Sequence, residues 1–408
     1  MNIKKNKLKQ LFKISLFSLI IVAIYGTMMR YKIAFDFRFF EQKNLLHAHS
    51  HFAFSGWISH LLYCGLTFIL YRFLPDIKEK KYYWIIIANL LCSVGMLLAF
   101  TMQGYGAVSI TLSTLTIIFS IIFTVFFIKD AKHFPPYHPS KPWAIMALLL
   151  NLFSSLGPFT LAYILATKNF QHELYLSAVY YYLHFQYSGW FFFGAMAIAA
   201  AYLPEGAFSL NKYFKVFAIT AFLTFFLSVL WIKLPLWLYV ITVIAALLQL
   251  VAWLFLLIRI KTVLEPIQVQ YPKWVNWFFY SAVFALTIKF VLQAVSVIPS
   301  LSQLVFGIRP MVIAYLHLVL LGIYSLFLIG YLFAEGFIKT SKSTKIFAFA
   351  FLAGVFVNEL LLAMQGFAAF SYIPIPYINE MLFGAAVLLL SSAVGMLFSQ
   401  LKIDKRVF

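Results

Sequence analysis

Long apolar runs limit what this chain can fold into. Hydrophobic residues make up 63% of its 408 residues and charged residues only 11%, so most of its surface cannot face water. A helix needs about 20 apolar residues to cross about 30 Å of hydrocarbon. Segments that meet this requirement are residues 11–29, 48–71, 82–101, 106–128, 143–166, 175–203, 213–232, 235–258, 275–298, 310–334, 345–366 and 378–400. We therefore predict an all-α polytopic membrane bundle of twelve transmembrane helices, with residues 1–408 forming a single integral membrane domain.

The basic residues indicate how the bundle is oriented. The net charge is +19, but the charges are spread over short loops rather than gathered into a patch, so we expect no nucleic-acid partner. With a cytoplasmic N-terminus, 23 Lys and Arg residues fall in inside segments and 7 in outside segments. This bias matches the positive-inside rule. We predict a multi-pass protein of the bacterial inner membrane, embedded in the lipid bilayer, with both termini in the cytoplasm. No small-residue cleavage site follows the first apolar run, so we expect it to remain as a signal-anchor helix.

One histidine motif recurs three times at a constant interval. The segments are HSHFAFSGWISHLLY from His49, YLHFQYSGWFFFGAM from Tyr182 and YLHLVLLGIYSLFLI from Tyr315. In each, the third residue is histidine and a glycine follows five positions later; these histidines are His51, His184 and His317, 133 residues apart. Such self-similarity is typical of repeat architectures. We predict three pseudo-repeats of four helices, approximately residues 1–140, 141–273 and 274–408.

The repeated histidines lie at equivalent places in the predicted bundle. Each is in the second helix of its repeat, within about two turns of the outer end, so all three are expected at one depth. The recurring glycine allows close approach of a helix or a flat ligand. One interpretation is a shared ligand site, and the other is repeated interhelical hydrogen bonding. Because ionisable groups inside a membrane are costly, we favour the ligand site.

Imidazole is the commonest nitrogen ligand for iron, copper and zinc. Two histidines on different helices suit the axial positions of a haem, whereas three that converge suit copper or zinc. The candidate metal ligands are therefore His51, His184 and His317. Spacing alone leaves the haem and the tri-histidine site open.

Twelve helices with histidines in the second, sixth and tenth resemble the catalytic subunit of the haem-copper oxidase superfamily, which includes nitric oxide reductases. The phrase HAHSHFAFSGW is also similar to the motif of haem-copper membrane proteins of the nitric-oxide response. The resemblance implies that His51 and His317 hold a low-spin haem, expected to be b-type, and that His184 is a ligand of copper or non-haem iron. It also implies an electron-donor protein at the outer face.

This sequence departs from that family at three positions. Tyr315 stands where the family's high-spin haem ligand would be, residues 213–232 contain no histidine pair, and Ser188 replaces the tyrosine four residues after the copper ligand. We therefore expect an incomplete copper site. The predicted function is electron transfer or redox chemistry of oxygen or nitric oxide, and oxidoreductase activity remains open.

Other histidines receive weaker assignments. His47 lies one turn outward of His51 on nearly the same face, so we expect it to replace His51 as a haem ligand or to bind a haem propionate. His49 points away by about 200° and His60 lies on the opposite face, and both are interpreted as structural. The loop residues His133, His138 and His172 are expected to be solvated.

Two charged residues fall within predicted spans and need a partner or a function. One interpretation pairs Lys289 with Glu359. The other assigns haem propionates to Lys289 and to the outer arginines, which are Arg30, Arg38 and Arg309. Glu359 then becomes a proton-carrying group and a weak catalytic candidate, as does Tyr187 beside His184.

The main alternative function is a transporter or metal-ion permease with a tri-histidine site coupled to Lys289 and Glu359. Transporters often carry internal repeats, usually two and often inverted. The three repeats here keep one orientation, which favours the haem protein.

Overall fold

The computed structural model describes residues 2–75, 77, 79–135, 137–168, 170–203, 211–264, 271–301 and 308–401. Within these residues the chain is helical and contains no strand. Eleven of its helices are long and apolar enough to cross a membrane, which makes this a multi-pass membrane protein. Four basic residues counted as cytoplasmic, Lys78, Lys402, Lys405 and Arg406, lie outside the described residues.

The predicted span at 175–203 is present as a helix but is not among these eleven. It runs without a break through α8 (His172–His184), a π-helical segment η2 (Phe185–Phe191) and α9 (Phe192–Ala200). Its first half carries Tyr, His and Gln side chains, which lower its mean hydropathy. Length and burial, rather than hydropathy, identify it as part of the bundle.

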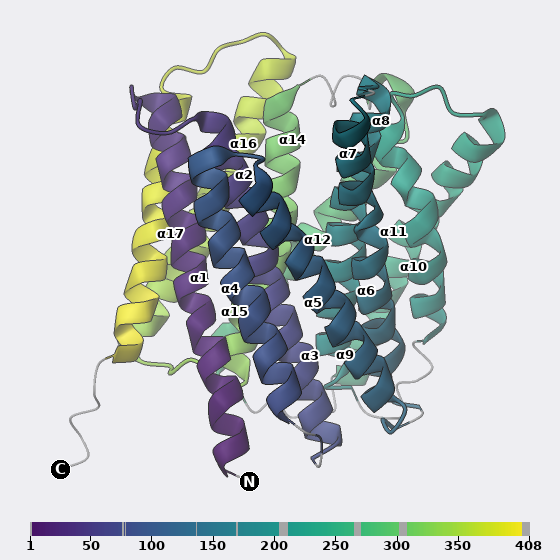
Figure 1. The fold of residues 1–408 in the computed structure, drawn as a ribbon, viewed down its shortest axis with the longest axis vertical. Helices are drawn as coiled ribbons and strands as arrows, with labels where there is room; N and C mark the ends of the chain where they lie inside the picture. The colour runs from purple at the N-terminus through teal and green to yellow at the C-terminus, as the bar shows by residue number, and fades with distance from the viewer. Residues whose placement is uncertain are drawn as a thin grey trace.

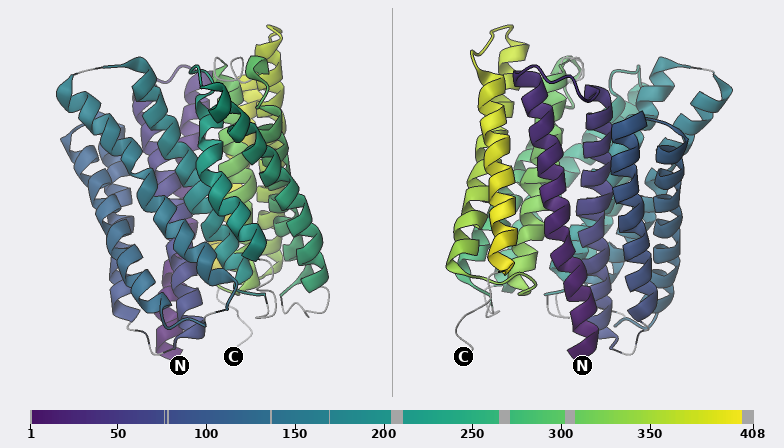
Figure 2. Two further views of the ribbon diagram at one scale, coloured as in Figure 1. Left: turned by 90° about the vertical axis from the view of Figure 1, so that its right-hand side faces the viewer. Right: turned by 60° about the vertical axis from the view of Figure 1, so that its left-hand side comes forward.

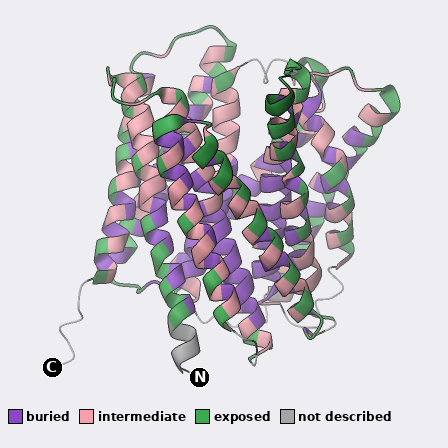
Figure 3. Cartoon of the chain, in the orientation of Figure 1, coloured by how far each residue is buried: buried purple, intermediate pink, exposed green. Residues whose placement is uncertain are grey.

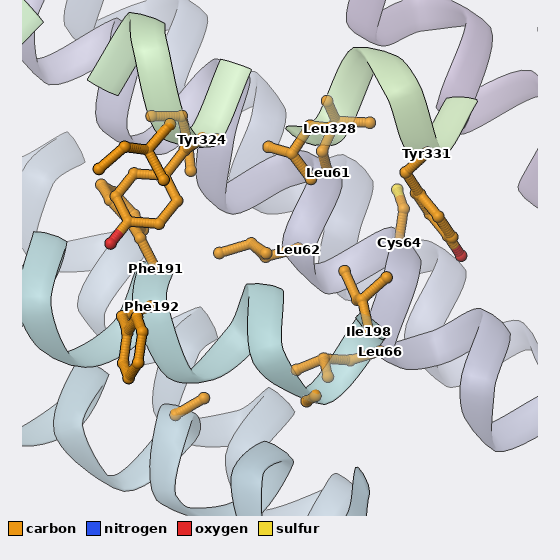
Figure 4. Close-up of a cluster of buried hydrophobic side chains, with 14 of the residues drawn as sticks. Leu61, Leu62, Cys64, Leu66, Phe191, Phe192, Ile198, Tyr324, Leu328 and Tyr331 are labelled. Atoms are coloured by element: carbon orange, nitrogen blue, oxygen red, sulfur yellow. The ribbon is translucent and has the colours of Figure 1, made fainter. Parts of the chain in front are cut away.

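Three long helices occupy the interior. They are Gln42–Phe73, made of α2 (Gln42–Phe52), η1 (Ala53–Ser59) and α3 (His60–Phe73); the helix His172–Ala200; and Arg309–Ala334, made of α14 (Arg309–His317), η6 (Leu318–Ser325) and α15 (Leu326–Ala334). Their apolar side chains meet in one core, where Leu62 of α3, Phe192 of α9 and Leu328 of α15 lie within the same cluster (Figure 4). The three helices that carry the repeated motif are therefore the inner ones.

The remaining helices complete the bundle (Figure 1). They are α1 (Asn2–Ala34), α4 (Glu79–Gln103), α5 (Ala107–Ala131), α6 (Ser140–Ser154), α7 (Leu156–Thr167), α10 (Asn211–Leu223) with its extension η4 (Thr224–Val229), α11 (Leu236–Leu264), α12 (Asn276–Val295) preceded by η5 (Lys273–Val275), α16 (Lys342–Phe370) and α17 (Ile378–Leu401). The first and last helices, α1 and α17, pack side by side (Figure 2). The start of α1 and the end of α17 lie at one end of the bundle (Figure 1). The large apolar side chains exposed on these outer helices suit contact with lipid.

A π-helical segment follows each repeated histidine. The segments Ala53–Ser59, Phe185–Phe191 and Leu318–Ser325 begin one or two residues after His51, His184 and His317. π-Helical turns are rare and occur frequently at functional sites. The sequence repeat is thus accompanied by a repeat in backbone geometry.

Hydrogen bonds between the inner helices fix their relative levels. The indole of Trp57 donates to Oγ of Ser325 at 2.8 Å, and that of Trp190 donates to Oγ of Ser59 at 2.9 Å. In both bonds the donor lies six residues after a repeated histidine and the acceptor eight residues after one. A two-residue offset is about 3 Å along a helix, so the three helices lie nearly in register.

Packing differs between the two ends of these helices. Every residue of η2 is buried, and so are ten residues of α3, whereas no residue of α14 and only two of α8 are buried. Figure 3 shows the buried residues concentrated in the middle and lower bundle, with half-buried ones above. The histidine ends of the inner helices are therefore the less densely packed ends.

Candidate functional site

Four helices bring ionisable side chains together near the upper end of the bundle. They are Arg30 of α1, His49 of α2, His317 of α14 and Glu359 of α16, here called the Arg–His–Glu cluster. His49 lies within electrostatic range of His317 and of Arg30, and Arg30 lies within range of Glu359. All four side chains are half-buried. Such a group inside a membrane bundle is a functional-site candidate.

Both imidazoles of this cluster are held in a defined orientation. Nδ1 of His49 lies 3.1 Å from the carbonyl oxygen of Val22, and Nδ1 of His317 lies 2.9 Å from that of Ile313. A carbonyl oxygen only accepts, so Nδ1 carries the proton in each ring. This leaves the Nε2 lone pair of each ring as the available metal ligand, which is the usual arrangement of ligating histidines.

Close packing of α1 against α2 positions His49. A Cβ atom at Gly26 would lie 3.4 Å from Cε1 of His49, so the ring rests directly on the backbone of α1. Asn358 of α16 donates to Oε1 of Glu359 at 3.2 Å and helps to hold this carboxyl group in place.

His51 lies on another face of its helix, toward α4 and the turn after it. Its ring stacks on Phe100 with 4.4 Å between centroids, and its Nε2 forms a 3.2 Å hydrogen bond with the Tyr105 hydroxyl. Burial and the nearby Tyr175 raise the pKa of Tyr105 to about 12, so this phenol stays protonated near neutral pH. His47 packs edge-on against the same Tyr105, and its buried Nε2 has no hydrogen-bond partner among the described residues.

His49 thus lies within electrostatic range of His317, while His51 contacts Tyr105 and Phe100. The two histidines have different neighbours because they are two residues apart on one helix and therefore point in different directions. His49 points toward α1 and α14. His49 was interpreted as structural because it points away from His51 on the helix, and it falls outside the repeat, where Tyr182 and Tyr315 stand at the equivalent positions. Two features of the sequence distinguish His49. It is a histidine where the other repeats have tyrosine, and Arg30 is predicted at the same depth in the membrane.

His184 has a different environment from His317. It is buried at 3% exposure, and its Nε2 donates to the carbonyl oxygen of Ala221 at 2.8 Å. Tyr187 lies near it, with 6.1 Å between the ring centroids, and also meets Tyr315 at 5.9 Å. Among the described residues, no three His, Cys, Asp or Glu side chains are grouped closely enough to hold a metal ion.

Lys289 and Glu359 are not paired. Lys289 is 4% exposed and donates to Oε1 of Gln293 at 2.8 Å, whereas Glu359 lies near Arg30. The interpretation that pairs them is wrong, because they face different parts of the bundle.

Only one of the arginines and lysines expected at haem propionates lies beside His317. Arg30 is in the Arg–His–Glu cluster. Arg38 forms an exposed ion pair with Asp36, and Arg309 is exposed at the start of α14. Lys289 belongs to the separate group with Gln293.

The remaining histidines divide between the core and the surface. His60 is fully buried and its Nε2 donates to the carbonyl oxygen of Leu11 at 3.0 Å, which agrees with a structural role. His133 and His172 are exposed as expected. The expectation of a solvated His138 is wrong, since its ring packs on Phe73 and is 2% exposed.

Comparison with protein-family models and with curated proteins finds no match to this chain.

Proposed function

We propose that this chain is a haem-binding integral membrane protein of respiratory type. The observation that carries the proposal is the pair formed by His49 and His317, two imidazoles on different inner helices whose Nδ1 atoms are bound to carbonyl oxygens. Nε2 of each ring is left to bind iron, and Arg30 beside them suits a propionate. A bis-histidine haem of b-type would supply one-electron redox chemistry.

The membrane topology that we propose has twelve crossings. The start of α1 and the end of α17 lie at one end of the bundle, which requires an even number, and the helix His172–Ala200 supplies the crossing beyond the eleven identified by hydropathy. The excess of basic residues at the chain-end side favours a cytoplasmic location for that side, in a bacterial inner membrane. The Arg–His–Glu cluster then lies in the outer half, where an electron-donor protein on the outer face would reach it.

His49 replaces His51 in this proposal as the partner of His317. His51 would have to leave both Tyr105 and Phe100 to bind the same iron. We propose instead that His51 and Tyr105 fix the position of α2 against α4. His47 is less favoured as a ligand because its ring also packs on Tyr105.

Electron transfer is favoured over oxygen or nitric oxide reduction. Nε2 of His184 donates a hydrogen bond to the carbonyl oxygen of Ala221 and is therefore not free to bind copper. Residues 211–229 contain no histidine that would complete a copper site. Tyr187 and Glu359 keep a secondary place in the proposal: Glu359 as a proton-carrying group near Arg30, and Tyr187 as a group beside His184.

The test is the haem spectrum of the purified full-length chain expressed with haem supplied. We expect reduced-minus-oxidised bands of a low-spin b-type haem. The variants His49→Ala and His317→Ala should lose them, whereas His51→Ala and His184→Ala should keep them. Loss in His51→Ala with retention in His49→Ala would restore the pair predicted from the repeat. A chain that binds no haem under these conditions would refute the proposal.

A metal-ion permease is the second candidate. It is favoured by one observation, a chain of polar side chains across η4, α11 and α12 that includes buried Lys289. Metal uptake by vesicles that contain the haem-free protein would support it. Haem bands that depend on His49 and His317 would count against it.

A further inference from the structure

A small internal cavity lies between the inner helix His172–Ala200 and the outer helices α10, α11 and α12. Its polar lining consists of Ser188, Gln249 and Lys289, and phenylalanine rings form the rest. The volume is about 10 Å³, close to the space that one water-sized sphere requires. The cavity is separate from the Arg–His–Glu cluster.

Lys289 is a buried basic side chain in this cavity, and the described residues provide no counter-charge for it. Its side chain is 4% exposed, and neither ion pair of the described residues involves it. Its Nζ donates to Gln293 and lies 4.4 Å from the centroid of the Phe290 ring, a contact that favours the charged ammonium group. An ammonium group has three donors, so donors remain after the bond to Gln293.

Hydrogen bonds fix the position of Lys289. Gln293 donates to Oε1 of Gln249 at 2.6 Å, and Gln249 donates to Oγ1 of Thr224 at 3.4 Å. The amide groups are therefore committed to one another, and their oxygen atoms are already acceptors. They orient the lysine without neutralising it.

Ser188 provides an unused donor in the same cavity. It is 7% exposed, and its buried Oγ has no hydrogen-bond partner among the described residues. An unpaired buried hydroxyl costs about 1–3 kcal/mol, so a ligand that accepts from it is favoured. The groups that remain to be satisfied, an ammonium group and a hydroxyl group, both donate.

We propose that this cavity binds a small monovalent anion of the halide class, with Lys289 and Ser188 as its donors. A halide accepts from both groups and balances the ammonium charge, whereas a water molecule satisfies the hydrogen bonds and leaves the charge uncompensated. Phenylalanine rings, including Phe192 and Phe217, form the rest of the lining. His184 lies within electrostatic range of Lys289 and adds no negative charge, because its Nε2 donates to Ala221.

The experiment is a chloride titration of the purified full chain, with gluconate replacing chloride at constant ionic strength and pH. The thermal unfolding midpoint is followed by tryptophan fluorescence, and binding is measured by the line width of ³⁵Cl in NMR. A ligand that binds the folded state raises the midpoint in a saturable way. We expect this for the wild type, and also for Ser392→Ala, a control for a buried serine of α17 that bonds within its own helix.

The two cavity variants decide the assignment. Ser188→Ala removes one charge-assisted hydrogen bond and should need about tenfold more chloride for half-saturation. Lys289→Met should lose the chloride dependence. A wild-type midpoint that does not respond to chloride would overturn the proposal and assign the cavity to water. If Lys289→Met does not fold, Ser188→Ala alone decides the assignment. An unchanged chloride concentration at half-saturation in Ser188→Ala would also overturn the proposal.

Discussion

The indole N–H of Trp57 donates to the hydroxyl of Ser325 at 2.8 Å, across 268 residues of sequence. Trp190 and Ser59 form the corresponding bond between another two of the inner helices. The third equivalent pair, Ile323 and Phe192, has no polar atoms in its side chains and cannot form such a bond. Two of three related contacts are therefore polar, and together they tie the three inner helices below the repeated histidines.

Removing the acceptor of this bond should destabilise the bundle. Ser325→Ala leaves the indole N–H of fully buried Trp57 without a partner, which costs about 1–3 kcal/mol of unfolding free energy. Thermal or denaturant unfolding in mixed micelles measures the loss. Ser391→Ala removes an exposed helical serine that bonds only its own helix, and it should leave stability nearly unchanged. Equal stability of the two variants would show that the Trp57 bond contributes nothing.

Gly157 lies where α7 packs tightly against α8. A Cβ atom there would come within 2.6 Å of the Ala178 carbonyl oxygen and 2.9 Å of the Tyr182 Cβ, and backbone atoms cannot yield without moving the helix. We expect Gly157→Ala to cost about 1–3 kcal/mol through overpacking. The matched variant is Gly384→Ala in α17, where an added Cβ meets nothing within 4 Å. It should instead gain about 0.5–1 kcal/mol from helix propensity. Unfolding midpoints that move in the same direction would contradict this prediction.

Arg30 and Glu359 should be energetically coupled. Arg30→Gln removes the cation near the half-buried side chain of Glu359, so Glu359→Gln in the same chain should restore part of the lost stability. We expect a coupling free energy of about 1 kcal/mol in a double-mutant cycle. The comparison cycle combines Lys289→Met with Glu359→Gln, whose effects should add within about 0.5 kcal/mol because the two side chains are not in contact. Coupling in the second cycle and none in the first would reverse the assignment of partners.

Much of the fold was predictable because the constraint that sets it is local. Any apolar stretch of about 20 residues must cross the bilayer with its backbone bonded internally, so the helix positions follow from hydropathy along the chain. The helix His172–Ala200 marks the limit of this rule, because burial inside the bundle, rather than lipid contact, accommodates its tyrosines and its glutamine. The repeated histidines His51, His184 and His317 lie on the three inner helices, but their spacing predicted only a common depth and not which helices are interior.

The partners of the polar residues were decided only by the tertiary structure. His49 and His51 differ by two positions, and that rotation directs one ring to α1 and α14 and the other to Tyr105. Glu359 was predicted to need a partner, but whether Arg30 or Lys289 supplies it depends on which faces of α1, α12 and α16 meet. Hydropathy along the sequence determines that a segment crosses the membrane. The direction in which each helix turns its polar face depends on side-chain packing with helices distant in sequence, and that is known only once the bundle has formed.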